Sequence, residues 1–314
     1  MATIEEARSL LAAGDFAGSV QLFGELLEQN PNESDLMSGF YAASYWQNRQ
    51  TLLETVPIGS QPGSYLIEEW RKFEKLLVAK NLSITESVNS AMRSVLSYAS
   101  RQFRHRFQER TINKSDLDVL LQLSKNLLRL SEYRNARDLL GFAMHLDNHR
   151  SSTLMLLGES RVQIGLREND NFEVDKGYSN IRDSFLLHPA PLLLDDYTSK
   201  PAVDIIEQMK RQIGADSIET ITNWLPAEWM AAVLNRPNLR RLSSDEILQI
   251  EDESNRLEQD LPNMADRFIE KASSRLCYFS LVLLHSLVHH YDNSVRQSEL
   301  IELINQLRPG LIRL

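Results

Sequence analysis

Two neighbouring helical patterns in residues 117–148 constrain the fold of this chain more than any other feature of its sequence. In the first pattern, large apolar residues recur at the spacing of one helix face, and in the second, small residues flank a large one. A small residue followed four positions later by a large one lets two antiparallel helices approach closely and interlock. The residues that form the two patterns are Leu120, Leu123, Leu127, Ala136, Leu140 and Ala143. A pair of this kind cannot bury its apolar face alone, so it must pack on further helices.

The same scheme occurs twice more along the chain. Near the N-terminus, Gly14 and Asp15 form the turn between two helical patterns. A third pair spans residues 151–189, with Gly158 at a close-packing position of its first helix. The segment 167–177 is rich in Asp, Glu and Asn, and we expect it to be an insertion that lengthens the turn of this third pair.

These three pairs, in segments 2–31, 117–148 and 151–189, resemble tetratricopeptide repeats (TPRs). The resemblance implies a right-handed α-solenoid whose concave face binds a protein or peptide partner. It therefore implies a scaffold, adaptor or assembly subunit. In TPR proteins the concave groove is lined mainly by the first helix of each pair. The residues at those positions here are Gln122, Lys125, Arg129, Met155, Glu159 and Gln163.

The repeat pattern ends before the chain does. We expect a TPR-like region over residues 1–195 and a C-terminal helical region over 196–314 that packs on the repeats as a cap. The boundary is placed at Asp195–Ser199, because Pro201 then supplies a favourable first residue for the next helix. The fold class predicted for the whole chain is all-α. The C-terminal helices are expected at Ala202–Ile213, Ser217–Leu234, Asp245–Glu258, Asn263–Tyr291 and Val295–Leu307.

Two of these helices should differ in burial. Leu276–Val288 is apolar on nearly all sides, so other helices should surround it. The segment Asp245–Asp260 carries seven acidic residues against one arginine, and it should be a solvated outer helix.

Between the first two repeat pairs, the sequence predicts helices that are not clear repeats. Arg49–Val56 should form a short helix, and Ile58–Ser64 should be a Gly/Pro/Ser loop. A capping-box pattern from Ser83 to Glu86 should start a long helix that ends near Gln108.

Composition and charge narrow the classes of function. The net charge is −9, with 34 Lys and Arg against 43 Asp and Glu, which disfavours general nucleic-acid binding. The longest apolar run, Leu276–Val288, is too short for a membrane span. No secretory signal is visible at the N-terminus, and the single Cys277 fits a reducing compartment. We therefore expect a cytoplasmic protein.

A basic strip in residues 101–114 offers one alternative function. Two phenylalanines accompany its cations, so it could bind phosphates and make the protein a signal-responsive regulator that acts on nucleic acid. The structural interpretation is that the rings pack inward while the cations extend to solvent or meet acidic helices. The strip consists of Arg101, Phe103, Arg104, Arg106, Phe107, Arg110 and Lys114.

A weaker alternative is a metal-dependent enzyme. His285 and His289 lie one helical turn apart, as do His145 and His149, and this spacing can bind a metal. However, the segment 285–289 lacks the glutamate that follows the first histidine in zinc proteases. No Gly-rich phosphate loop or Gly-x-Ser-x-Gly elbow occurs. The sequence thus predicts a non-enzymatic protein with no cofactor and no metal.

Overall fold

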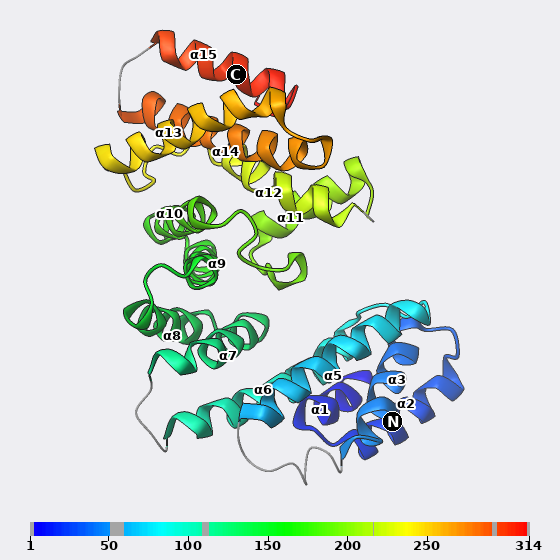
Figure 1. Ribbon diagram of the computed structural model, residues 1–314. Helices are drawn as coiled ribbons and strands as arrows, with labels where there is room; N and C mark the ends of the chain where they lie inside the picture. Colours follow the sequence, from blue (N-terminus) through cyan, green and yellow to red (C-terminus); the bar gives the residue numbers. More distant parts are fainter. Residues whose placement is uncertain (1–2, 51–59, 109–112, 216, 291–293, 313–314) are drawn as a thin grey trace. The chain divides into compact units, whose positions relative to one another are not determined.

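The described part of the chain is all-α, as the sequence predicts. The computed structural model describes residues 3–50, 60–108, 113–215, 217–290 and 294–312. Within these ranges it contains fourteen α-helices and three short 3-10 helices, and no strand (Figure 1). The helices form two compact units, Met1–Glu132 and Tyr133–Leu314, which are described separately below. None of the helices in the described ranges combines the length and apolar character needed to cross a bilayer.

The first unit begins with the predicted N-terminal hairpin. Gly14 adopts a left-handed conformation (φ 84°) that ends the first helix, and Asp15 caps the next one by accepting a hydrogen bond from the amide of Gly18. At the contact between the two helices, the Ser19 hydroxyl lies 3.3 Å from the carbonyl oxygen of Ala7. The α-helices of this unit are α1 (Ile4–Ala13), α2 (Phe16–Gln29), α3 (Ser34–Gln47), α5 (Ser60–Ala79), α6 (Glu86–Gln108) and α7 (Leu117–Arg129).

The long helix α6 packs against α1, α3 and α5, so it joins parts of the unit that are distant in sequence. Asp35 of α3 fixes its start, because the Asp35 carboxylate accepts hydrogen bonds from the amide and hydroxyl of Ser87 at 3.1 and 2.9 Å. Arg8 of α1 pairs with the same carboxylate. In a simple repeat array each helix pair contacts mainly its neighbours, and the packing of α6 on α1 differs from that pattern.

Two sequence predictions in this region need correction. Helix α6 begins at Glu86, so Ser83 does not cap it. Thr85 lies next to the helix start, and its hydroxyl is 3.5 Å from the Val88 amide. The predicted loop Ile58–Ser64 is helical from Ser60 onward, because α5 starts there. Most of the predicted helix Arg49–Val56 lies outside the described residues.

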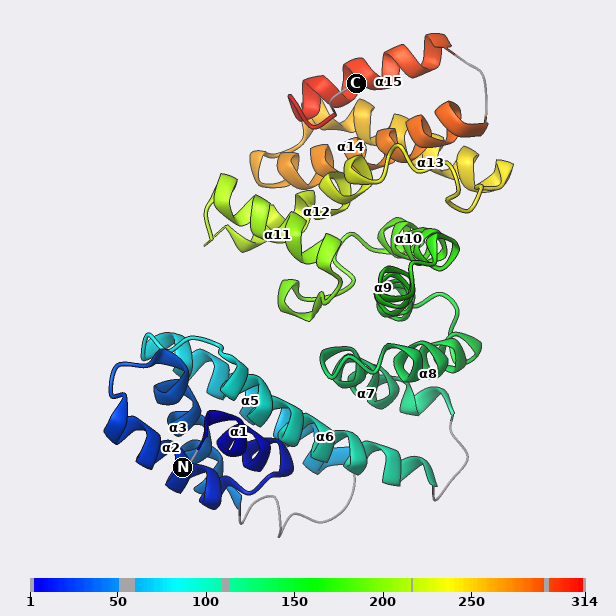
Figure 2. The ribbon, with the colours of Figure 1, turned by 180° about the vertical axis from the view of Figure 1, so that it is seen from behind.

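The second unit contains the C-terminal helices close to their predicted positions. Figure 2 shows them from behind. The α-helices are α8 (Tyr133–Leu146), α9 (Ser151–Glu168), α10 (Asn171–Leu187), α11 (Lys200–Ile213), α12 (Ile218–Ala232), α13 (Ser244–Asp260), α14 (Asp266–His290) and α15 (Ser294–Leu307), with the 3-10 helices η2 (Leu194–Asp196) and η3 (Leu261–Asn263) between them.

Helices α9 and α10 form a hairpin that depends on glycine. A Cβ on Gly158 would lie 2.5 Å from the side chain of Ile181 and 2.8 Å from the carbonyl oxygen of Gly177. A Cβ on Gly177 would lie 2.9 Å from the Gly158 carbonyl oxygen. Since real Cβ atoms do not approach so closely, only glycine permits this backbone contact.

The predicted insertion at 167–177 is wrong, because the turn of this hairpin is tight. Asn169 adopts a left-handed conformation (φ 55°), and Asp170 then caps α10 by accepting hydrogen bonds from the amides of Phe172 and Glu173. The polar residues after Asp170 therefore belong to the first turns of α10. Asp and Asn are common both in loops and at helix starts, so their presence alone does not distinguish a long loop from a tight turn followed by a helix.

The burial predicted for two C-terminal helices is confirmed. Within the predicted run Leu276–Val288 of α14, residues 276–286 are buried, Leu287 is partly exposed and Val288 is exposed. In α13 the buried residues are Ile250 and Ser254, so most of this acidic helix faces solvent. The apolar run thus forms the centre of the second unit, and α12, α13 and α15 pack on it.

The units divide at a different place from the predicted domain boundary. Contacts separate the chain between Glu132 and Tyr133, whereas the sequence prediction placed the boundary at residue 195. The division falls in the turn of the pair at 117–148, so α7 belongs to the first unit and α8 to the second. Residue 195 lies inside the second unit, where the segment that follows it is bound to α9.

Candidate partner-binding site

Two of the predicted groove residues are buried and cannot contact a partner. Met155 and Glu159 both lie on α9 with no exposed side chain. The Glu159 carboxylate accepts hydrogen bonds from the amides of Thr198 and Ser199 at 2.8 and 2.5 Å, and from their hydroxyls at 3.3 and 2.6 Å. On the same helix, the Gln163 amide donates to the carbonyl oxygen of Thr198 at 2.6 Å. Glu159 and Gln163 thus anchor the start of α11 on α9.

The environment of this anchor is strongly desolvated. Burial raises the pKa of Glu159, although the hydrogen bonds from Ser199 and Thr198 act in the opposite direction. Burial and the nearby Glu159 carboxylate also hold the pKa of Tyr197 well above its ordinary value. An ionisable group in such a place is costly unless every polar atom has a partner. Here the partners come from a segment forty residues away, which spacing along one helix does not reveal.

The other predicted groove residues lie on α7 in the first unit. Gln122, Lys125 and Arg129 are all partly exposed. The Arg129 guanidinium forms an ion pair with Glu74 of α5. Residue spacing along α7 does not reveal this pairing, because Glu74 lies on another helix. Arg129 therefore joins two helices of the first unit.

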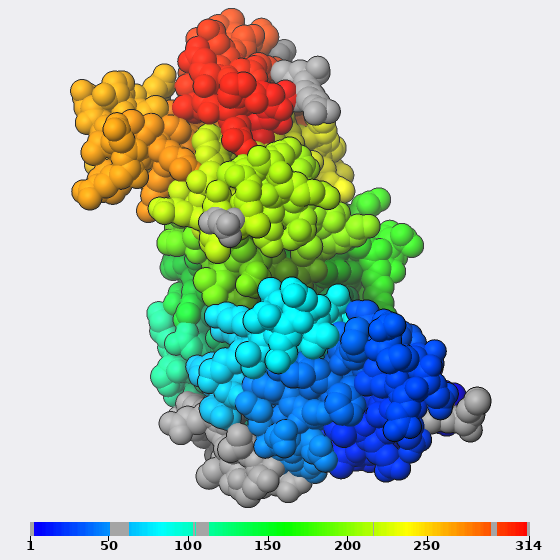
Figure 3. Space-filling view, turned by 90° about the vertical axis from the view of Figure 1, so that its right-hand side faces the viewer, coloured from blue at the N-terminus to red at the C-terminus, as the bar shows by residue number. Residues whose placement is uncertain are grey.

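The second unit contains a pocket of about 590 Å³ between α12, the end of α13 and the first half of α14, next to the end of α10. Its lining is mainly apolar, and Phe268 in its wall is 50% exposed. Figure 3 shows the segment from the end of α13 to the start of α14, coloured gold to orange, projecting from the surface of this unit. The pocket is lined by His188, Pro189, Asn223, Leu257, Met264, Phe268, Lys271, Ala272, Ser274 and Arg275.

Cations follow one face of α14 beside this pocket. Arg267, Lys271 and Arg275 are spaced four residues apart, so they lie one above another on the helix. Neither Arg267 nor Lys271 forms an ion pair within the described part of the chain. The Arg267 guanidinium instead lies 4.6 Å from the centre of the Phe268 ring. We refer to these three residues as the α14 cation row.

Arg275 has a structural contact as well. Its guanidinium donates hydrogen bonds to the carbonyl oxygens of Phe185 and Leu186, the latter at 2.6 Å, and so caps the end of α10. It also lies 4.2 Å from the centre of the Phe279 ring. Burial lowers the pKa of Arg275, but an arginine keeps its charge at any physiological pH. The pocket therefore has a fixed positive charge close to its apolar wall.

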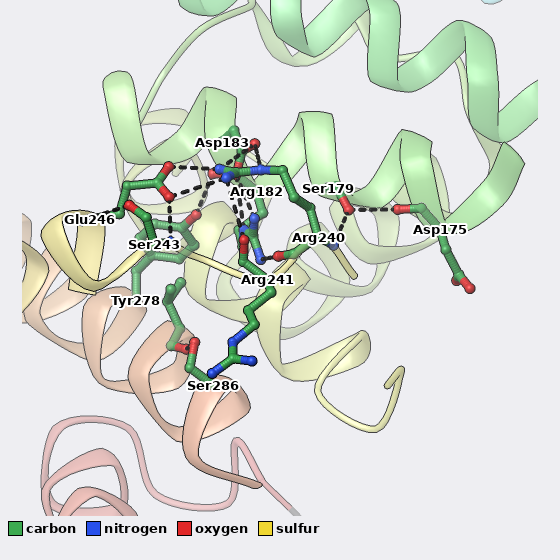
Figure 4. A network of polar contacts seen from close by, with 11 residues as sticks. Asp175, Ser179, Arg182, Asp183, Arg240, Arg241, Ser243, Glu246, Tyr278 and Ser286 are labelled. Carbon is green, nitrogen blue, oxygen red and sulfur yellow. Dashed lines mark hydrogen bonds and ion pairs between the residues drawn. The ribbon is translucent and has the colours of Figure 1, made fainter. Parts of the chain in front are cut away.

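A polar network holds the start of α13, whose other end supplies Leu257 to the pocket. Arg240 bonds both Asp183 of α10, at 3.0 Å, and Glu246 of α13, at 2.8 Å (Figure 4). The Arg240 partner lowers the pKa of Glu246 to about 2. The buried Arg182 donates to Asp183 and to the carbonyl oxygen of Arg240. Sequence analysis missed this network because its members come from three separate segments.

The polar side chains of the pocket differ in whether they are already hydrogen-bonded within the protein. Ser274 donates its hydroxyl proton to the carbonyl oxygen of Lys271 at 3.0 Å, so this hydroxyl is engaged with the backbone. The side-chain amide of Asn223, by contrast, makes no hydrogen bond within the part of the chain that the structure describes. The lining thus presents an apolar floor, a polar amide and positive charge.

Only part of the basic strip at 101–114 is described. Arg101 is exposed and lies 5.3 Å from the ring centre of Tyr98, and Arg104 forms an ion pair with Glu132 at 3.2 Å. Arg110 and the side chains of Arg106, Phe103 and Phe107 lie outside the described residues. The described contacts of Arg101 and Arg104 agree with the structural interpretation of the strip.

The histidines of α14 bind backbone carbonyls. Nε2 of His285 lies 2.8 Å from the carbonyl oxygen of Arg236, and Nε2 of His289 lies 2.9 Å from that of Leu234. Because a carbonyl oxygen only accepts, each Nε2 must carry a proton, and that nitrogen cannot bind a metal at the same time. No cluster of three or more potential metal ligands occurs among the residues with described positions, and these include His145 and His149.

Comparison of the chain with models of protein families, with curated proteins and with solved structures found no match.

Proposed function

We propose that this protein is a non-enzymatic scaffold or adaptor, and that its second unit binds a segment of a protein partner in the pocket between α12 and α14. One observation carries the proposal. A mainly apolar pocket of about 590 Å³ opens beside a half-exposed phenylalanine and the α14 cation row. Aromatic residues, methionine and arginine are the types enriched where protein interfaces gain most of their affinity.

The surroundings of the pocket support a protein partner. Phe268 and Ile269 both expose apolar surface at the start of α14. Leu187, at the end of α10, does the same next to His188 of the pocket. A partner segment could therefore place one side chain in the pocket and cover neighbouring apolar surface, which is how interface anchors work.

The proposal also includes three expectations from the sequence: TPR-like repeats, an α-solenoid and a cytoplasmic location. The TPR-like character, the α-solenoid and the cytoplasmic location are supported by the helical hairpins α1–α2 and α9–α10 and by the single buried Cys277. The proposed binding surface is, however, different from the predicted groove, because Met155 and Glu159 are buried.

The test is affinity capture with two matched variants of the full chain. Phe268→Ala removes the aromatic wall of the pocket. Phe172→Ala removes a phenylalanine of α10 that is 67% exposed and does not line the pocket. Both rings lie against a cation, Arg267 and Lys176 respectively, so the two truncations are chemically alike.

We expect Phe268→Ala to lower recovery of the partner by about tenfold or more, as truncation of an aromatic anchor does. Phe172→Ala should leave recovery unchanged, and both variants should keep the wild-type circular dichroism spectrum. Equal recovery with wild type and Phe268→Ala would place the interface elsewhere.

A further inference from the structure

We infer that the partner segment is acidic, with an apolar side chain for the pocket next to one or more carboxylates for the α14 cation row. This inference rests on the proposed function and names the chemistry of the partner. The observation behind it is that the charged residues lining the pocket are positive, whereas the net charge of the chain is negative.

The first observation is the composition of the lining. The chain has a net charge of −9, but its pocket is lined by Lys271 and Arg275 and by no acidic residue. Glu253 of α13 exerts an electrostatic influence on Arg275, but it does not line the pocket and forms no ion pair with that guanidinium. Within an acidic protein, the pocket is thus a local positive site.

The second observation is that the cations of the row repel one another, while Glu270, three residues from Arg267, accepts a hydrogen bond from Thr220 and forms no ion pair with Arg267 among the described residues. Like charges four residues apart on a helix repel each other, and Arg267–Lys271 and Lys271–Arg275 are two such pairs. Arg267 also lies in the first turn of α14, where the helix dipole favours negative charge. A bound carboxylate would relieve both effects.

The third observation is donor capacity. Arg275 has five N–H groups, and its hydrogen bonds to the carbonyl oxygens of Phe185 and Leu186 occupy only some of them. Lys271 is exposed at the rim, and the Asn223 amide lies on the α12 side of the pocket. Carboxylate oxygens accept hydrogen bonds from all three types of group, and the partial burial of Arg275 strengthens such contacts.

The experiment is a selection with a displayed library of random twelve-residue peptides, using the full-length protein as bait. Peptides are retained if they bind wild type and Phe172→Ala but not Phe268→Ala, which selects for dependence on the pocket. They are then measured by fluorescence anisotropy against Lys271→Glu. Lys200→Glu serves as control, because Lys200 is exposed on α11, has the same change in charge and does not line the pocket.

We expect the retained peptides to be enriched in Asp or Glu next to a large apolar residue. Their affinity should fall at least tenfold with Lys271→Glu, stay within twofold with Lys200→Glu, and weaken as salt concentration rises. Pocket-dependent peptides without acidic enrichment, or acidic peptides indifferent to Lys271→Glu, would overturn this inference and leave the proposed function standing. If no peptide depends on Phe268, the proposed pocket function fails together with the inference.

Discussion

The two units join their helices in different ways. In the first unit, aromatic rings fill the space between α3 and α5, where Trp46 and Trp70 stack with ring centres 5.8 Å apart. Arg8 and Arg129 of this unit pair with acids of other helices, Asp35 and Glu74 respectively. In the second unit, α9 and α10 meet through glycine, and two cations of α14 have no acidic partner among the described residues. Ion pairs connect helices in both units, since Arg240 joins α10 and α13 in the second, but the α14 cation row leaves charge available at the surface.

The largest effect should come from the glycine contact. Gly158→Leu would place side-chain atoms against Ile181 and the backbone of Gly177, and it should destabilise the second unit by about 3 kcal/mol. Gly141→Ala in α8 is the control, since a Cβ there meets nothing within 4 Å, and it should stabilise by about 0.5–1 kcal/mol. Urea unfolding of both variants measures the difference. Equal stability would mean that α9 and α10 do not pack as closely as described.

The Glu159 anchor should have the next largest effect. Glu159→Ala leaves the buried amide of Ser199 and the partly buried amide of Thr198 without acceptors, and we expect a loss of about 2 kcal/mol in the free energy of unfolding. Thermal unfolding followed by circular dichroism would measure it. A variant as stable as wild type would show that the start of α11 is not anchored on α9.

The Arg240–Glu246 pair predicts a dependence on pH. The pKa of Glu246 falls from its ordinary value near 4.5 to about 2 in the folded protein. Its contribution to stability is therefore complete above pH 4.5 and is lost as the pH falls toward 2. Because the Glu246 side chain is 35% exposed, we expect this contribution to be only about 1 kcal/mol. Glu246→Gln should narrow the gap between unfolding free energies measured at pH 7 and pH 3. If the difference between the two pH values were the same as in wild type, Glu246 would not contribute to the acid sensitivity of the protein.

The smallest effects are expected from reversing one charge in each unit. These two variants directly test whether the charges of α14 differ from the ion pairs of the first unit. Arg129→Glu should destabilise the first unit by about 1 kcal/mol, since it replaces an ion pair with Glu74 by repulsion. Lys271→Glu should instead be neutral or stabilise by a few tenths of a kcal/mol, because it creates opposite charges four residues from Arg267 and Arg275. Melting temperatures of the two variants would show this difference. If both fell equally, the charges of α14 would be structural like those of the first unit.

Much of the fold could be predicted from the sequence. Helix positions follow from apolar spacing and caps, as the N-terminal hairpin at Gly14 and the buried run in α14 show. The close approach at Gly158 was also predicted from a small residue at the right spacing. These features depend on residues that are near each other in the chain.

The candidate site could not be predicted in this way. Glu159 occupies a position that lines the groove in TPR proteins, but here a distant loop covers it. The pocket combines residues from the end of α10, from α12, from the end of α13 and from α14, and no local pattern connects them. Arg267, Lys271 and Arg275 are spaced four apart in the sequence, but only the structure shows that they lie beside a pocket and have no ion pair with an acid in the described ranges.

The hydrogen bonds between Glu159 and residues 198–199 also affect how the protein can be divided for experiments. A fragment that ends at residue 195 would remove the four donors and leave a carboxylate in an apolar interior, so it should aggregate or unfold. The predicted boundary is therefore a poor place to truncate the chain. A fragment from Tyr133 to the C-terminus keeps both sides of this contact, and crystallisation or binding studies of the second unit should begin from that one.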